Sequence, residues 1–206
     1  MKLNLHVKPI EQSKSALVMI EYQNEWVSDG GGLRNLLVKD KEQFKLAIHH
    51  SKSLLAAARK QGLSVIHVTL KPDSEYRVFG DAAFGLRAAI PKVNSWKGEM
   101  KSIHSAFEPL PNEHVITERV GASGFSGSNL DSFLRNNGID TLFLAGFATH
   151  VCVESTLREA HDKGYRTFVV TDATGAFTKS QQIYFESEVL HHFGYGINVD
   201  QFKEIF

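Results

Sequence analysis

Short apolar runs alternate with longer amphipathic segments along most of the chain. Residues Ala16–Ile20 (ALVMI) are apolar at every position, which is typical of a strand buried on both faces of a parallel sheet. Asp40–Gln61 has apolar residues at helical spacing and is followed by Gly62, a residue that favours helix termination. The same criteria predict strands at Leu63–Leu70, His114–Thr117, Thr141–Ala145, Thr167–Val170 and Gly196–Val199, and helices at Ser128–Asn136, from about Cys152 to Gly164, and at Ser180–Phe193.

This alternation predicts an α/β fold in which parallel strands are joined by right-handed helical crossovers. No internal repeat, low-complexity tract or linker interrupts it, so we expect a single domain over residues 1–206. Two segments lack the pattern: Tyr22–Lys39 is rich in Gly and Asn, and Lys71–Lys101 is long and contains two prolines. Segments of this kind are usually lids or walls of a binding site.

The composition is that of an ordinary globular protein, with 42% hydrophobic and 22% charged residues. Lys plus Arg equals Asp plus Glu at 23 each, which gives no indication of a nucleic-acid or anionic-membrane partner. A single cysteine cannot form an internal disulfide, and the first fifteen residues contain no apolar block typical of a signal peptide. The longest apolar stretch, residues 142–148, is too short to span a bilayer. We therefore expect a cytoplasmic protein.

The one cysteine, Cys152, lies where a strand passes through a turn into a helix. A helix N-terminus favours the thiolate, the nucleophilic form of the side chain. The turn Gly146–Thr149 has backbone N–H groups that could face a developing oxyanion. The alternative is a buried, inert cysteine, which is common in protein cores. The pattern alone leaves both interpretations open.

Polar residues follow the predicted strands at their carboxyl ends, which is where an open parallel sheet binds its ligand. Glu21 follows the first strand, Arg119 the third and Cys152 the fourth. A carboxylate, a cation and a thiol should therefore converge at one edge of the sheet.

The runs ALVMIEYQNEW and VITERVGASGFSGSNLDSFLRNNGIDTLFLAGFATHVCVESTLREA, in this order, resemble the isochorismatase-like cysteine hydrolases. That family includes nicotinamidases, N-carbamoylsarcosine amidohydrolases and ureidoacrylate hydrolases. The resemblance extends from about Ser15 to Phe193 and is strongest around G-x-x-T-x-x-C-V, which begins at Gly146. It implies a three-layer Rossmann-like sandwich with a six-stranded parallel sheet, and an Asp–Lys–Cys triad. It also implies a cis peptide between Phe147 and Ala148 and an oxyanion hole formed by the amides of Ala148 and Cys152.

The triad implied by the resemblance falls on Glu21, Arg119 and Cys152, so two of its three positions depart from the family pattern. Glu21 is one methylene longer than Asp, and Arg119 is bulkier than Lys and is effectively never deprotonated. The two changes either compensate for each other or weaken the site.

The strand ends and long segments also supply expected pocket residues. These are Gln23, Trp26, Trp96, Phe125, Thr149 and Phe177. The resemblance implies a metal site only for the nicotinamidase branch, through an Asp-x-His pattern just after the second strand. The corresponding run here, HVTLKPDSEYRVFG, lacks it, and the ten histidines have no convincing ligand spacing. We therefore expect neither metal nor cofactor.

The sequence thus predicts a metal-independent cysteine hydrolase that cleaves an amide or carbamoyl C–N bond in a small molecule through a thioester. Two alternatives remain: an impaired member that binds a small molecule or partner, and a hydrolase of a non-amide bond such as that of isochorismate. The resemblance also implies a homo-oligomer.

Overall fold

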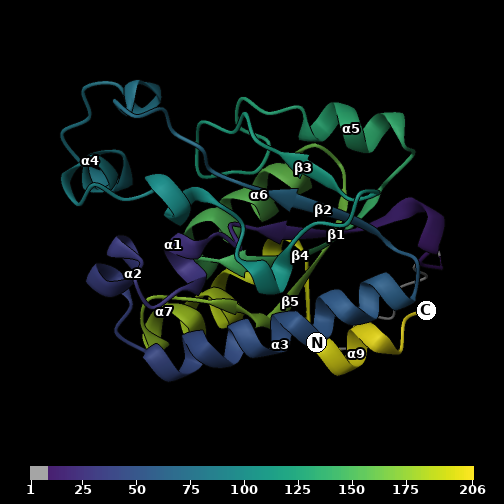
Figure 1. The fold of residues 1–206 in the computed structure, drawn as a ribbon. Helices are drawn as coiled ribbons and strands as arrows, with labels where there is room; N and C mark the ends of the chain where they lie inside the picture. The colour runs from purple at the N-terminus through teal and green to yellow at the C-terminus, as the bar shows by residue number, and fades with distance from the viewer. Residues whose placement is uncertain (1–8) are drawn as a thin grey trace.

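The computed structural model describes residues 9–206, which form a twisted sheet covered by helices on both faces (Figure 1). Every neighbouring pair of strands is parallel, and the strand order is β3-β2-β1-β4-β5-β6. The order reverses between β1 and β4, which creates a crevice beyond their carboxyl ends. The strands are β1 (Ser15–Ile20), β2 (Ser64–Val68), β3 (His114–Ile116), β4 (Thr141–Phe147), β5 (Arg166–Gly175) and β6 (Tyr195–Ile197).

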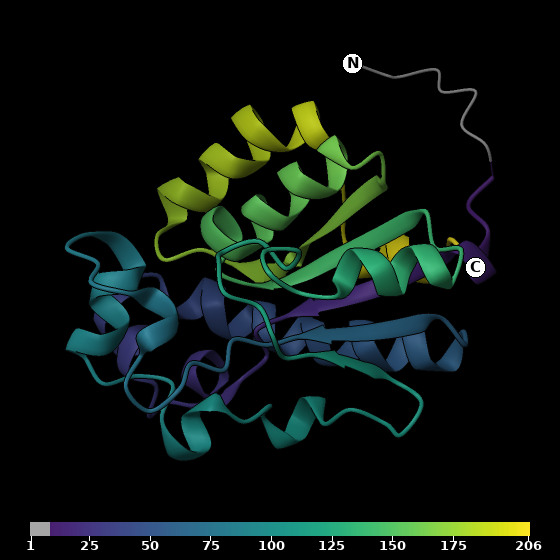
Figure 2. The same ribbon diagram turned by 90° about the horizontal axis from the view of Figure 1, so that it is seen from above.

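The two faces of the sheet bury separate apolar cores. In β1, Leu17 and Met19 pack into one core, and Ala16, Val18 and Ile20 into the other, because successive side chains point to opposite faces. The first core lies under α3 (Lys41–Lys60) and α9 (Val199–Lys203). The second lies under α5 (Leu130–Asn136), α6 (Glu154–Asp162) and α8 (Leu190–Phe193) (Figures 1 and 2). The predicted three-layer α/β architecture with six parallel strands is confirmed.

Some predicted element boundaries were wrong. β4 continues to Phe147 and β5 to Gly175, because pairing resumes after an irregularity, with Gly146 beside Thr174 and Phe147 beside Gly175. The helix predicted over residues 180–193 contains a π-helical segment between α7 and α8. Its parts are α7 (Lys179–Tyr184), the π-helical η6 (Phe185–Val189) and α8.

The two long segments contain short helices that their Gly, Asn and Pro content concealed. These helices gather near the carboxyl edge of the sheet, where α1, α2 and α4 lie beyond the strand ends (Figure 1). Residues 22–39 form α1 (Asn24–Val27) and α2 (Gly32–Leu37), and residues 71–101 form η2 (Arg77–Phe79), α4 (Gly85–Lys92) and η3 (Gly98–Lys101). Two further single turns are η1 (Gln12–Lys14) and η4 (Ser105–Phe107).

Within residues 9–206, no helix combines the length and apolarity needed to cross a membrane. The first fifteen residues were expected to contain no signal peptide, and residues 1–8 of this segment lie outside the described residues.

At the opposite edge from the crevice, the carboxylate of Glu113 joins α3 to β2. It accepts hydrogen bonds from Arg59 Nε and Nη2 at 2.7 and 2.9 Å, and its Oε2 lies 2.8 Å from His67 Nε2. Burial opposes the ionisation of Glu113, but the hydrogen bonds from Arg59 and His67 outweigh it and hold its pKa at about 2.

Because this pKa is lowered from 4.5, the stabilisation by Glu113 is complete above pH 4.5 and is lost as the pH falls through about 2. We expect Glu113→Gln to lower the free energy of unfolding at neutral pH by about 1.5–3 kcal/mol. The decline in stability between pH 4.5 and 2 should also become shallower than in the native protein. Urea unfolding over this range measures both effects. Glu108→Gln, at a neighbouring exposed carboxylate, is the control and should leave the slope unchanged.

Candidate active site

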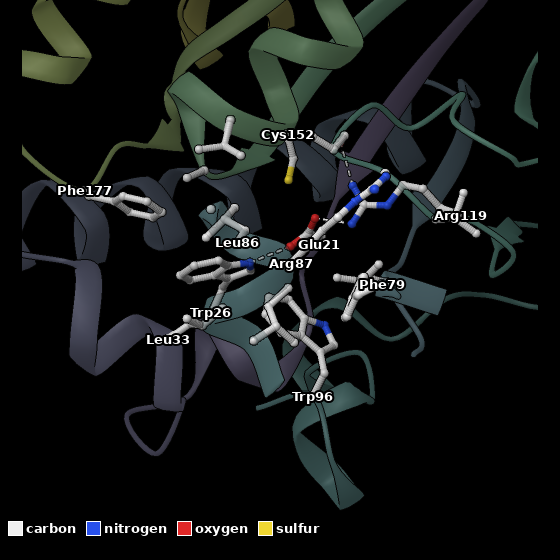
Figure 3. Close-up of a pocket in the computed structure, with 18 of the residues that line it drawn as sticks. Glu21, Trp26, Leu33, Phe79, Leu86, Arg87, Trp96, Arg119, Cys152 and Phe177 are labelled. Atoms are coloured by element: carbon white, nitrogen blue, oxygen red, sulfur yellow. Dashed lines mark hydrogen bonds and ion pairs between the residues drawn. The ribbon is translucent and has the colours of Figure 1, made fainter. Parts of the chain in front are cut away.

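The crevice between β1 and β4 brings together three residues that are far apart in the sequence. Glu21 follows β1, Cys152 follows β4, and Arg119 comes from the loop after β3. All three line one cavity, and all three are buried (Figure 3). The convergence expected from the strand order is therefore observed.

Glu21 is held by its backbone and by both carboxylate oxygens. Its φ is +56°, an unusual conformation for a residue other than glycine that costs about 1–3 kcal/mol. Its N–H donates to the Val68 carbonyl at 2.8 Å. Oε1 forms an ion pair with Arg119 Nη2, and Oε2 accepts a hydrogen bond from Trp26 Nε1 at 2.6 Å. The carboxylate therefore has a fixed position and orientation.

Arg119 is buried with its partner, and each side chain is only 1% exposed. Its Nη1 donates to the Ala122 carbonyl at 2.9 Å, which ties the guanidinium to its own loop. Burial alone would lower the pKa of Arg119, but the Glu21 carboxylate and Cys152 raise it above its ordinary value. The guanidinium of Arg119 thus keeps its charge in a buried ion pair with Glu21.

Cys152 lies in η5 (Thr149–Val153), a π-helical turn that leads into α6. Its thiol lies in the same cavity as Glu21 and Arg119, and both side chains affect its pKa. Burial raises the pKa of the thiol, and the Glu21 carboxylate raises it further, whereas Arg119 opposes the shift. The direction is opposite to the lowering expected at a helix N-terminus, because desolvation and the nearby negative charge outweigh the helix dipole. The resting side chain is therefore a neutral thiol.

The turn before Cys152 depends on a close approach of two strands. Gly146 has φ of +130°, and a Cβ at this position would lie 2.0 Å from the Ile20 carbonyl oxygen. Only glycine fits there, so β4 can end directly against the residue that precedes Glu21. The next peptide, Phe147–Ala148, is cis, as the family resemblance implies.

The cavity that these residues line has a volume of about 340 Å³. Ala148 and Cys152, the expected oxyanion-hole residues, line it beside the ion pair, as do the predicted pocket residues Trp26, Trp96 and Phe177. Much of the apolar wall was not predicted from the sequence, including Leu33, Leu70, Phe79, Leu86 and Ile90. The spacing of four residues between Leu86 and Ile90 was a signal for α4.

A family model for the isochorismatase domain matches residues 15–201. The chain belongs to the isochorismatase family. An uncharacterized isochorismatase family protein of Bacillus subtilis, YrdC, is 28% identical over 94% of this chain and 92% of its own length. The ureidoacrylate amidohydrolase RutB of Caulobacter segnis is 32% identical over 81% of this chain and 74% of its own. The structure of N-carbamoylsarcosine amidase from Thermoplasma acidophilum matches with a TM-score of 0.67 and 25% identity, over 91% of this chain and 97% of that one. The expected family and its hydrolase class are confirmed.

Three expected pocket residues of this family member lie outside the lining of the cavity. Gln23 is buried, and its amide bonds to the backbone of Leu70 and Lys101 at 2.6–2.8 Å. Thr149 donates to Gln182 Oε1 at 2.7 Å, and the Phe125 ring stacks on Tyr165 at 5.8 Å. These side chains hold the edge of the site together and do not form its surface.

Among residues 9–206, no group of three or more His, Cys, Asp or Glu side chains is arranged to hold a metal ion. The ion-paired Glu21 and the lone Cys152 do not form a ligand set with any histidine.

The buried ion pair generates a stability prediction. Glu21→Gln or Arg119→Met should each lower the free energy of unfolding by about 3–5 kcal/mol, because each leaves the partner charge buried and unpaired. The double variant should lose much less than the sum of the two singles. Urea unfolding of all four proteins completes the cycle.

A matched control is the exposed pair Asp200–Lys203, at 2.9 Å. Asp200→Asn should leave the free energy of unfolding nearly unchanged, because an exposed ion pair contributes little. Additive losses at Glu21 and Arg119 would contradict the strong coupling of the pair.

Proposed function

We propose that this protein is a cysteine hydrolase that cleaves an amide or carbamoyl C–N bond in a small molecule. Cys152 is the nucleophile, Glu21 the proton acceptor and donor, and Arg119 the cation that holds the charge of the site. The observation that carries the proposal is the buried Glu21–Arg119 ion pair, which lines one cavity together with the only thiol of the chain. The similarity to the ureidoacrylate amidohydrolase RutB and to N-carbamoylsarcosine amidase, both named for hydrolysis of a C–N bond, supports it.

The first half of the reaction forms a thioester. As the Cys152 sulfur attacks the carbonyl carbon, the thiol proton passes to the Glu21 carboxylate, so that no free thiolate accumulates in the buried site. The carbonyl oxygen becomes an oxyanion near the backbone amides of Ala148 and Cys152. Collapse of this intermediate breaks the C–N bond, and the proton on Glu21 transfers to the leaving amine.

The second half releases the acid. Glu21, again a carboxylate, takes a proton from a water molecule, whose oxygen attacks the thioester carbon. The C–S bond breaks, the sulfur regains the proton from Glu21, and the product leaves as a carboxylic or carbamic acid. Throughout both halves Arg119 keeps its positive charge and compensates the negative charge on either partner.

An impaired member of the family is the alternative, and one observation favours it. Both oxygens of the Glu21 carboxylate already accept hydrogen bonds, from Arg119 and from Trp26. Each oxygen has one further lone pair, so a proton from Cys152 must be accepted alongside both of these donors. We propose in addition that the reaction needs no metal and that the protein is a cytoplasmic, single-domain homo-oligomer.

The proposed nucleophile is tested by Cys152→Ala. Ammonia release from a panel of small amides and ureas should fall to the uncatalysed rate, because no thioester can form, and a chelator should have no effect on the native protein. An electrophilic amide analogue should add its acyl mass to native Cys152, seen by mass spectrometry of the intact chain. The control Ser155→Ala changes a residue of α6 outside the cavity lining and should retain activity. Turnover by Cys152→Ala would exclude the thioester route.

The departure from the family triad is tested by restoring the smaller residues. Glu21→Asp and Arg119→Lys should each reduce kcat about a hundredfold, since the carboxylate and cation move by roughly 1 Å from the thiol. The double variant should recover part of the loss in kcat, because the shorter Asp and the less bulky Lys can form an ion pair with each other. If the double variant instead exceeds the native rate by tenfold or more, the native pair is impaired and the alternative function stands.

A further inference from the structure

The cavity has two chemically different ends. The reacting end contains Glu21, Arg119 and Cys152, and the remainder is walled by aromatic and aliphatic side chains from several separate segments (Figure 3). Trp26 comes from α1, Phe79 from η2, Trp96 from the segment after α4, and Phe177 from the segment after β5. A volume of about 340 Å³ is at the small end of the range for small-molecule sites, with room for one ring system beside the reacting group.

The aromatic wall is held rigidly in place. The indole of Trp26 is fixed by its hydrogen bond to Glu21, and its ring meets Trp96 edge-on at 5.6 Å and Phe177 at 5.6 Å with a 31° tilt. The backbone N–H of Trp96 donates to Glu25 Oε2 at 3.1 Å. Trp26 and Trp96 are each 2% exposed, so neither ring is free to swing away. A fixed wall of flat faces selects a ligand by shape.

Charge is scarce along this wall. Among the described residues that line the cavity, Arg87 of α4 is the only charged side chain besides Glu21 and Arg119, and it is exposed. A small anionic ureido acid bound with its amide at Cys152 would lose hydration of its carboxylate against Trp26 or Phe79. The polar groups that this part of the lining offers in exchange are the unpartnered indole N–H of Trp96 and the exposed Arg87. An apolar ring at the same place removes both its own surface and the wall from water.

We propose that the substrate is an amide or carbamoyl compound whose non-reacting part is a flat apolar ring, an aryl or arylalkyl group, seated between Trp26, Trp96 and Phe79. This inference rests on the proposed function for the reacting group, but the choice of ring comes from the wall alone. Arg87 is the exposed cation of the lining. It can donate a hydrogen bond to a polar substituent on the ring without being required for binding.

The first test compares turnover of acetamide, N-carbamoylglycine, phenylacetamide and benzylurea by the native protein, followed by ammonia release. The aryl compounds should have kcat/KM values on the order of a hundredfold above those of their small counterparts, from burial of one ring. The proposal is tested by the ratio of the kcat/KM value of an aryl compound to that of its small counterpart, not by either rate alone. N-carbamoylglycine turned over as well as benzylurea or better would overturn it while leaving the cysteine hydrolase intact.

Variants of the wall locate the effect. Trp96→Ala should reduce the aryl-to-acetamide ratio about tenfold, mainly through KM, because one face of the ring site is lost. Since Trp96 is deeply buried and its loss could unfold the chain, Leu86→Ser on the half-buried face of α4 provides a second variant with the same expected direction. Leu110→Ala, at an exposed position outside the cavity, is the control and should leave the ratio unchanged.

Binding without turnover separates the two proposals. In Cys152→Ala, phenylacetamide and benzylurea should quench tryptophan fluorescence, since they contact two indoles, at concentrations at which acetamide and N-carbamoylglycine do not. If the native protein hydrolyses none of the four compounds but this binding preference holds, the proposed reaction fails and the aryl site stands. Equal or absent quenching by the aryl compounds overturns the aryl site whatever the activity.

Discussion

The ion pair between Glu21 and Arg119 is the constraint on which the rest of the site depends. Both side chains are almost fully removed from water, so each charge is tolerated only because the other is in contact with it. Glu21 extends from the end of β1, and Arg119 from a loop that follows β3, two strands away. Trp26 of α1 adds a third segment through its hydrogen bond to the same carboxylate. One carboxylate therefore fixes three segments against the end of β4, where Cys152 lies.

The same pair explains why the thiol is neutral. A guanidinium that faced the sulfur alone would favour the thiolate, but here the Glu21 carboxylate balances its charge and raises the pKa of the thiol. Burial adds to the cost of a second negative charge. In the proposed reaction, proton transfer therefore accompanies the attack by Cys152, and the Glu21 carboxylate must be near enough to receive the proton. The longer reach of Glu and the planar fork of Arg suit this arrangement, because Arg119 bonds to Glu21 and to the Ala122 carbonyl at once, which a point charge such as Lys does less well.

The sequence predicts the sheet and the convergence of Glu21, Arg119 and Cys152, because both follow from local pattern. Continuous apolar runs such as residues 16–20 are distinctive, and the residue after a parallel strand lies at the ligand edge whatever its loops do. Gln23 shows where this reasoning ends. It lies two residues beyond Glu21, yet its amide turns away to the backbone of Leu70 and Lys101, 47 and 78 residues distant. No local pattern specifies such partners. The wall residues Leu86 and Ile90 do follow a local pattern, the spacing of a helix. They were missed because that helix is short and contains Pro91.

A second buried carboxylate links the reacting end of the cavity to its apolar wall. Glu25 accepts hydrogen bonds from the backbone N–H groups of Leu33 at 2.6 Å and Trp96 at 3.1 Å. Burial raises its pKa, and these backbone N–H groups oppose the rise. Glu25 and Trp26 are neighbours on the four-residue helix α1. Trp26 holds the Glu21 carboxylate, and Glu25, the residue before it, holds Leu33 and Trp96 of the wall. A ligand that presses on Trp96 or Leu33 therefore acts on α1, and through Trp26 on the orientation of Glu21. The position of the apolar wall and the orientation of the Glu21 carboxylate thus depend on the same single turn of helix.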